Sequence, residues 1–464
     1  MTAGSGTTVE VGYHEGWDPV ARAGVGRLPE AEARRRDGAG EPYAALLTVH
    51  RRPKALFLVD WRHGYLGLFL LDGAARRDRE YEYRQLEPGR LHLRRYQEWR
   101  HASDSGPEHP EGGRCFTVTV RPDGRATVVL AGDGSMSVRA EVPAGHRSAA
   151  KAEFGAWTAY ADATLLGLRG PVDLVPAPWD APAPAAPAAP GWAAPRPLAP
   201  RHLEALFTPG SRLADEEERV AVVTEPEPVG LLHLPSGAVT AADPGTTGEH
   251  EDPFTVTVPP GDYPVLIATM RWEGEDWGET PAAMLRITDR PTSTWELALR
   301  PDQDGRLLGA GQYYGFGVDT AMGCFLDATG RATLPELFHQ QHRDPGLWGE
   351  GAPAAVEVQD PATGTNLIAY ASGTGDGCYP VWIGRDADGA VTCFVADMLV
   401  LHHADALPPT VPSPAVTVLP YTPVADDRRE APFTSPGGTA GFLAARIAEV
   451  VEAEAEAARR RCLP

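Results

Sequence analysis

Cysteine is scarce in this sequence, and its five residues are scattered. They are Cys115, Cys324, Cys378, Cys393 and Cys462. No two of them have the spacing of a zinc knuckle or of a CxxC redox pair, so neither kind of site is expected. An odd number of separated thiols is typical of reduced cysteines in a reducing compartment. We therefore expect a cytoplasmic protein.

Long apolar runs and excess positive charge are also missing. No run of about eighteen apolar residues occurs, so no membrane-spanning helix is expected. Residues 1–30 lack the basic start and apolar stretch of a secretory signal. The 42 Lys and Arg residues stand against 63 Asp and Glu, which gives a formal net charge of −21. Because nonspecific binding to nucleic acid or anionic membranes needs positive surface, neither partner is expected.

The motifs of several common mechanisms do not occur. The sequence has no P-loop, no GxGxxG after a strand, no HExxH and no GxSxG. Nucleotide, zinc-protease and esterase mechanisms therefore have no support. We expect no cofactor and no metal ion.

Short apolar runs separated by turn residues fill the chain and predict strands. Residues 115–132 are typical, because two β-rich runs flank a Pro-Asp-Gly turn at 122–124. The 464 residues exceed what one hydrophobic core usually supports. We expect a mainly β (α+β) protein with two β-rich domains joined by a Pro/Ala-rich linker and followed by a C-terminal helix.

Composition shifts divide the chain into five parts. We expect a poorly ordered N-terminal segment (1–40) with a helix near Pro29–Arg36, an antiparallel β domain (41–175) closed by a helix at 149–166, a linker (176–200), a second β-rich domain (201–422) and an amphipathic helix (435–461). Dense proline favours extended geometry in the linker. The apolar stripe of the last helix could dock on its own chain or on a second subunit.

One segment, Arg76–His101, carries eight arginines against five acids. Two interpretations are open. The segment could form a face that binds polyanions, or a solvated sheet face with cross-strand ion pairs. The second interpretation is the more common arrangement in β proteins, and we favour it.

Two glycine-rich stretches carry the candidate functional residues. Residues 313–327 read YYGFGVDTAMGCFLD, and residues 371–380 read ASGTGDGCYP. Glycine permits close backbone approach, and apolar strands flank both stretches, so we expect them to lie side by side. The candidate binding or active-site residues are Tyr313, Tyr314, Asp319, Cys324, Asp327, Asp376, Cys378 and Tyr379.

Each kind of candidate residue has a functional and a structural interpretation. The three acids could bind a cation or share a proton, or they could cap turns by accepting backbone N–H bonds. Either cysteine could be a nucleophile if a histidine lies beside it, or it could be a small buried residue. The tyrosines could line a pocket or pack in the core.

A family resemblance covers the second domain. It is carried by GLLHLPSGAVTAADP, VPPGDYPV, WELAL and the two glycine-rich stretches with their flanking strands. Over about residues 230–402 the sequence resembles the bacterial domain-of-unknown-function family 4241. The resemblance implies a compact β-rich domain and supplies no catalytic residues.

Two functional hypotheses follow. The first is a non-catalytic binding protein of the immunity or defence type, whose partner is a basic protein or a small molecule. The alternative is an enzyme, a hydrolase or lyase of specialised metabolism, that uses acids of the two glycine-rich stretches.

Overall fold

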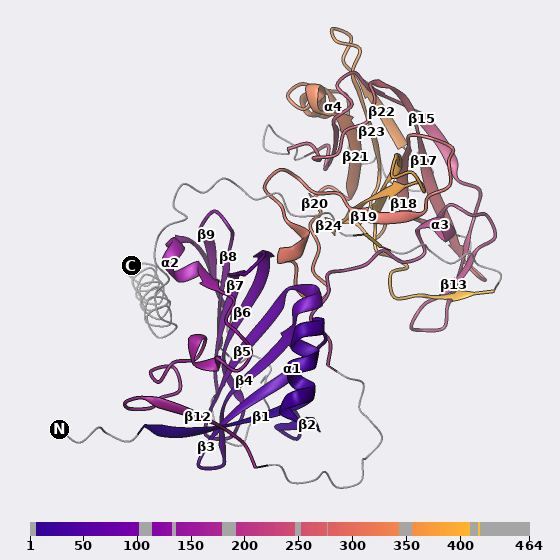
Figure 1. Ribbon diagram of the computed structural model, residues 1–464. Helices are drawn as coiled ribbons and strands as arrows, with labels where there is room; N and C mark the ends of the chain where they lie inside the picture. The colour runs from indigo at the N-terminus through magenta and orange to yellow at the C-terminus, as the bar shows by residue number, and fades with distance from the viewer. Residues whose placement is uncertain are drawn as a thin grey trace, which may run out of the picture. The chain divides into compact units, whose positions relative to one another are not determined.

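The computed structural model describes residues 6–101, 114–131, 136–178, 192–245, 252–275, 277–342, 355–408 and 416–417. The chain divides between Ala194 and Pro195 into two compact units, each of which is described by itself. Strands dominate both units (Figure 1), so the mainly β prediction is confirmed. None of the helices in the described ranges is long and apolar enough to cross a bilayer.

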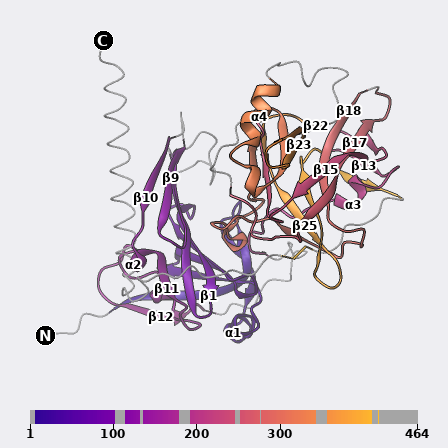
Figure 2. The same cartoon turned by 90° about the horizontal axis from the view of Figure 1, so that it is seen from above.

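The N-terminal unit is built on one large sheet within its described residues. In sheet order the strands are β10 (Met136–Glu141), β9 (Arg125–Ala131), β8 (Arg114–Val120), β7 (Arg90–Arg100), β6 (Arg77–Glu87), β5 (Tyr65–Leu71), β4 (Arg52–Asp60), β3 (Tyr43–Val49), β1 (Thr7–Asp18) and β12 (Val172–Pro176). Strands β3 to β10 follow one another as antiparallel neighbours, as Figure 2 shows for β9 and β10. Strand β12 instead pairs in parallel with β1.

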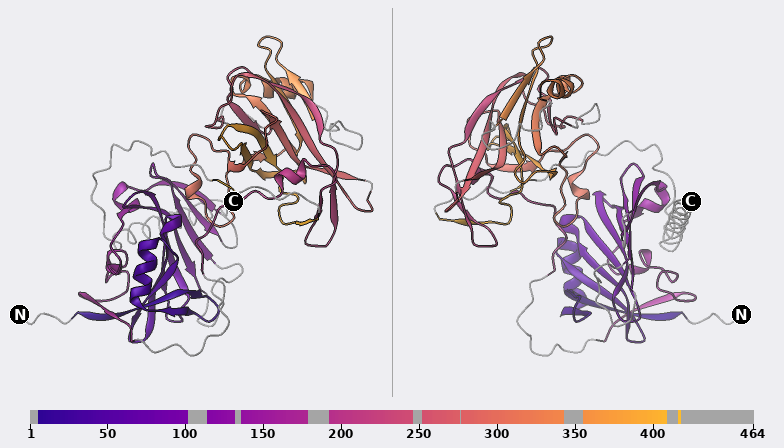
Figure 3. Two further views of the ribbon diagram at one scale, coloured as in Figure 1. Left: turned by 45° about the vertical axis from the view of Figure 1, so that its right-hand side comes forward. Right: turned by 180° about the vertical axis from the view of Figure 1, so that it is seen from behind.

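The start of the chain belongs to this sheet. Strand β1 lies between β3 and β12, and β2 (Ala23–Leu28) pairs with β1 as well. The prediction of a poorly ordered segment is therefore wrong for residues 7–28, because Val9, Val11 and Tyr13 are buried in the core. The helix near Pro29 is confirmed as α1 (Glu30–Ala39), which lies against the sheet (Figure 3) and ends at Gly40 with φ +72°.

The predicted closing helix at 149–166 is wrong. This region holds β11 (Ser148–Ala150), which pairs with β7, and the short 3₁₀ helix η2 (Trp157–Ala159). Gly155 has a φ of +93°, which a regular helix does not allow. Trp157 nevertheless packs in the core, with its ring centroid 4.8 Å from that of Phe57.

The arginine-rich segment forms strands β6 and β7, which are paired neighbours. Glu82 receives ion pairs from Arg84 at 2.8 Å, Arg94 at 2.7 Å and Arg95 at 3.2 Å. The expected ion pairs are therefore present. They are not solvated, however, because Glu82 is 1% exposed and Arg94 is 3% exposed.

The C-terminal unit combines three sheets in its described residues. The largest contains β19 (Thr294–Leu297), β25 (Val381–Arg385), β26 (Val391–Asp397), β18 (Gly278–Arg286), β17 (Gly261–Trp272), β14 (Val220–Val223), β13 (Arg212–Ala214) and β27 (Asp405–Leu407) in order, with β15 (Glu227–Leu234) also on β17. A second contains β16 (Val239–Ala242), β21 (Met322–Asp327), β23 (Asn366–Ala371) and β22 (Ala355–Gln359). The third pairs β20 (Phe316–Val318) with β24 (Gly377–Tyr379).

The core of this unit lies between the first two sheets. Phe325, Ile368 and Tyr370 of the smaller sheet are fully buried with apolar residues of the larger one, such as Ile267 and Phe394. The described residues of this unit include two α-helices. They are α3 (Leu203–Leu206) and α4 (Leu334–Gln341), and α4 packs beside β22.

Two predicted segments fall wholly or partly outside the described residues. The C-terminal helix at 435–461 lies there, as does most of the linker, residues 179–191. Of the linker's described residues, Trp192 packs 5.5 Å from Tyr65 between ring centroids, within the N-terminal unit. Residues from Pro195 onward belong to the C-terminal unit.

The buried ion pairs generate a stability prediction. Glu82→Gln removes the charge that three arginines share, of which Arg84 and Arg94 are buried, so it should lower the free energy of unfolding by about 3–5 kcal/mol. Glu30→Gln is the matched control, because its pair with Arg34 is on the surface and should contribute no more than about 1 kcal/mol. Urea denaturation of both variants measures the difference. Equal, small losses would show that the buried cluster carries no stability.

Candidate functional site

The two glycine-rich stretches lie side by side, as predicted. Strand β20 is antiparallel to β24, with Phe316 opposite Tyr379 and Val318 opposite Gly377. Gly315 allows this approach, because a Cβ atom there would lie 2.5 Å from the carbonyl oxygen of Tyr379. A side chain at that position would therefore push the two strands apart.

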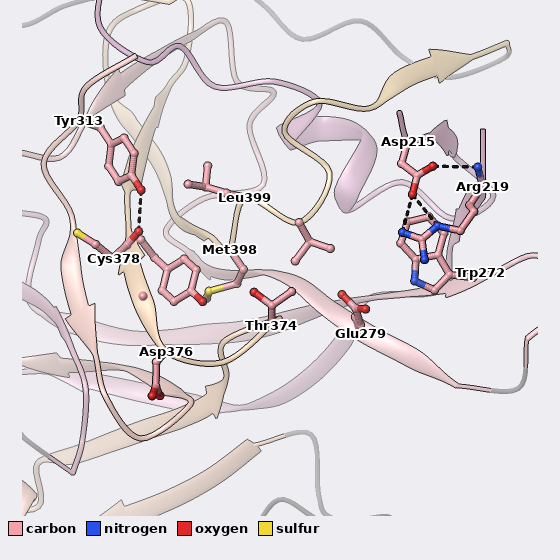
Figure 4. Close-up of a pocket in the computed structure, with 13 residues that line it drawn as sticks. Asp215, Arg219, Trp272, Glu279, Tyr313, Thr374, Asp376, Cys378, Met398 and Leu399 are labelled. Carbon is pink, nitrogen blue, oxygen red and sulfur yellow. Dashed lines mark hydrogen bonds and ion pairs between the residues drawn. The ribbon is translucent and has the colours of Figure 1, made fainter. Parts of the chain in front are cut away.

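A cleft of about 500 Å³ opens beside this strand pair (Figure 4). It is lined by Asp215, Arg219, Trp272, Glu279, Tyr313, Thr374, Asp376, Gly377, Cys378, Tyr379, Met398, Leu399 and Val400. Four of the eight candidate residues are in this lining, namely Tyr313, Asp376, Cys378 and Tyr379. The other four, Tyr314, Asp319, Cys324 and Asp327, do not line it.

The tyrosines stiffen one end of the cleft. The Tyr313 hydroxyl donates to the carbonyl oxygen of Cys378 at 2.8 Å. The hydroxyl of Tyr379 donates to the carbonyl oxygen of Gly375 at 2.7 Å, and Ser372 Oγ donates to the same oxygen at 2.8 Å. These bonds fix the loop that carries Asp376, so this wall of the cleft is set before any ligand binds. Tyr314 instead donates to the carbonyl oxygen of Asp304.

The three candidate acids have different surroundings. Asp327 is fully buried and accepts hydrogen bonds from the backbone and side chains of Ser236 and Thr329, at 2.6–3.0 Å. The Asp376 side chain is exposed and accepts from the backbone N–H of Ala321 at 3.2 Å. Asp319 is exposed. The structure thus supports turn capping for Asp327, and it leaves Asp376 as the candidate acid that faces the cleft.

Asp243, which sequence reasoning missed, holds the turn after β20. Its buried carboxylate accepts from the backbone N–H groups of Gly245, Asp319 and Thr320 at 2.7–2.9 Å and from Thr320 Oγ1 at 2.7 Å. Asp-Pro-Gly at 243–245 is a turn signal. That signal is local, so it could not show that Asp243 binds a turn far along the chain.

Neither candidate cysteine meets the needs of a nucleophile. Burial raises the pKa of the Cys324 thiol well above its usual range. Partial burial also raises the pKa of Cys378, and nearby Arg300 opposes that shift. Within the described ranges, neither sulfur atom is hydrogen-bonded to a histidine. The same ranges contain no group of three or more His, Cys, Asp or Glu side chains that could hold a metal ion.

The opposite end of the cleft is polar. Its lining residues were not among the candidates from the sequence. The guanidinium of Arg219 lies 4.5 Å from the ring centroid of Trp272 and forms an ion pair with Asp215 at 2.7 Å. Trp272 is 5% exposed. Two buried polar atoms here, Trp272 Nε1 and Glu279 Oε2, have no hydrogen-bond partner in the described part of the chain.

Asp397 lies directly behind the cleft wall formed by residues 398–400. Its carboxylate accepts from the backbone N–H of Leu399 at 2.9 Å and from Trp382 Nε1 at 3.3 Å. Burial raises the pKa of Asp397 from 3.8 to about 6, because removal from water disfavours the ionised carboxylate. Two neutral donors do not offset that effect.

The C-terminal unit has a recognisable family match. Residues 232–396 match family DUF4241, described as a protein of unknown function. The resemblance predicted for about 230–402 is thereby confirmed, whereas the N-terminal part matches no family. No curated protein and no solved structure matches the chain. The DUF4241 region contains most of the cleft lining, from Trp272 to Tyr379.

The buried position of Asp243 predicts a large effect on stability. Asp243→Ala leaves several partly buried donors without an acceptor, so it should lower the free energy of unfolding by roughly 1–3 kcal/mol. Asp319→Ala, in the turn that Asp243 binds, should change it by no more than about 0.5 kcal/mol because that side chain is exposed. Thermal or urea unfolding compares the two. Similar losses would show that Asp243 does not hold the turn.

The raised pKa of Asp397 predicts how stability depends on pH. An acid whose pKa is higher in the folded chain than in the unfolded chain loses its stabilising effect as pH rises from about 4 to about 6. Asp397→Asn has no carboxylate that could ionise, so its free energy of unfolding does not fall for this reason as the pH rises. Its free energy of unfolding minus that of the wild type should therefore increase by about 2–3 kcal/mol between pH 4 and pH 7. The difference at pH 4 isolates the packing effect, and a difference independent of pH would refute the shift.

Proposed function

We propose that this protein is a non-catalytic binding protein whose C-terminal cleft receives a basic group of a protein partner. One observation carries the proposal. The cleft brings aromatic rings and carboxylates together, but its candidate acids and thiols accept no hydrogen bond from a histidine within the described residues. A site of this composition can hold a cation without a nucleophile or a general base.

Charge supports a basic partner. Three carboxylates, those of Asp215, Glu279 and Asp376, line the cleft with one arginine. The whole chain has a formal net charge of −21, which attracts a positively charged protein over a distance and speeds the encounter. The ring of Trp272 already carries a guanidinium on its face, that of Arg219. A cation from a partner has the same kind of contact open to it.

The partner class proposed is a basic cytoplasmic protein that this chain neutralises, as immunity or defence proteins do. A small molecule with a cationic group fits the same cleft chemistry. The enzyme alternative needs Asp319, Asp327 or Asp376 to contact a histidine or a thiol. The hydrogen bonds that Asp327 and Asp376 accept come from backbone amides and hydroxyl groups, so the geometry favours binding.

Affinity capture tests this proposal. The full chain is immobilised and incubated with lysate of its native host, beside an unrelated acidic protein of similar net charge. We expect enrichment of a basic protein on this chain alone. The purified partner should bind directly, with an affinity that falls as salt rises from 50 to 300 mM because charge steers the association. Absence of any specific partner, together with turnover of a small molecule, would contradict the proposal.

A further inference from the structure

Acidic residues gather at the end of the large sheet next to the cleft. The turn at 215–219 joins β13 to β14, and residues 273–275 and 277 lie between β17 and β18. These turns are neighbours, because Ala221 pairs with Trp272 and the backbone N–H of Glu273 donates to the carbonyl oxygen of Val220. The acids in the described part of this end are Asp215, Glu216, Glu217, Glu218, Glu273, Glu275 and Glu279.

Local arginines leave part of this charge without an ion pair. Arg212 pairs with Glu273, and Arg219 pairs with Asp215 and, at 3.5 Å, with Glu217. Glu216 and Glu218 are exposed. An acidic surface alone is not a binding site, since acids are often only solvated. A binding site also needs a feature within the cleft that indicates a ligand.

Beside the acidic surface, the cleft contains a hydrogen-bond donor, Trp272 Nε1, and an acceptor, Glu279 Oε2, that have no partner within the described residues. Glu279 pairs with Met270 across β17 and β18, so its side chain projects from the same face as Trp272. Figure 4 shows Glu279 between Trp272 and Thr374 along the cleft. Within the described residues Trp272 Nε1 donates no hydrogen bond and Glu279 Oε2 accepts none. Leaving both groups unpaired is unfavourable, so they indicate a ligand that supplies an acceptor and a donor.

Arg219 is the side chain that a ligand would displace. Its guanidinium covers the ring of Trp272, yet the side chain remains 49% exposed. A long, exposed side chain can move aside at small energetic cost. Its position shows that a guanidinium fits over this ring, next to Asp215 and within the lining that contains Glu279.

We infer that this end of the sheet binds an Arg- or Lys-rich peptide segment of the partner, an inference that rests on the proposed function. The basic side chain of the segment enters the cleft and donates to Glu279 Oε2. A main-chain carbonyl oxygen of the segment accepts from Trp272 Nε1. The exposed Glu216–Glu218 attract neighbouring basic residues. A peptide fits better than a polyamine, because a polyamine has donors but no acceptor for the indole N–H.

The test uses a fluorescein-labelled twelve-residue Arg/Lys/Gly peptide and fluorescence anisotropy with the full chain. Glu279→Gln should weaken peptide binding by about tenfold or more, because it removes a charged, desolvated partner. Glu336→Gln removes the same charge from the exposed surface of α4, outside both the cleft lining and the acidic turns, and should weaken binding by less than about twofold. A melting temperature for each variant checks that the fold persists.

Trp272→Phe separates a peptide from other cations. It keeps an aromatic ring but deletes the N–H donor, so we expect peptide binding to weaken by about fivefold and spermine binding to stay unchanged. Equal losses for Glu279→Gln and Glu336→Gln would show that only general charge attraction is at work, and would overturn the inference. Spermine binding more tightly than the peptide would also overturn it. In both cases the capture of a basic partner by the full chain would still support the proposed function. The proposed function and the peptide inference can therefore fail independently.

Discussion

A buried carboxylate needs hydrogen-bond donors, and this constraint shapes the cleft. Asp243 meets it by accepting from the amides of Asp319 and Thr320, which form the turn between β20 and β21. The turn therefore holds β20 where it can pair with β24. Gly315 then lets the two backbones approach closely enough for that pairing. The wall of the cleft that carries Asp376 and Cys378 depends on these contacts.

The same constraint separates structural acids from acids open to a ligand. Asp327 stands at the other end of β21, and its donors are Ser236 and Thr329. Asp243 and Asp327 thus anchor both ends of one strand. Their lone pairs are occupied by internal bonds, whereas Asp376 and Glu279 belong to the lining of the cleft. Under the proposed function, these are the carboxylates that attract a cation to the cleft.

In the N-terminal unit a buried carboxylate is stabilised by ion pairs. Glu82 of β6 is buried beside Arg84 of the same strand and beside Arg94 and Arg95 of β7, which keeps each charge close to an opposite one. A buried pair of this kind does not by itself make a protein more stable than apolar packing would. It does penalise any strand register that separates the charges, so it favours the pairing of β6 with β7 that the structure shows.

The sequence alone determined features that depend on local patterns. Alternating apolar residues and turn residues predicted the β class, and the glycines of residues 313–327 and 371–380 predicted that these stretches meet. The helix predicted at 149–166 was wrong, because Gly155 adopts a positive φ there. Each of these signals acts over a few residues.

Only the tertiary structure decided which distant groups meet. Strand β1 lies between β3 and β12 in the sheet, and the donors to Asp243 lie in a turn at 319–320. Likewise Trp272 and Glu279 share a cleft with Cys378, which no spacing in the sequence could show. Partners of this kind are set by the packing of whole sheets. Local propensity carries no information about them, because the hydrogen bonds of a buried polar group are fixed by whichever segment the fold brings beside it.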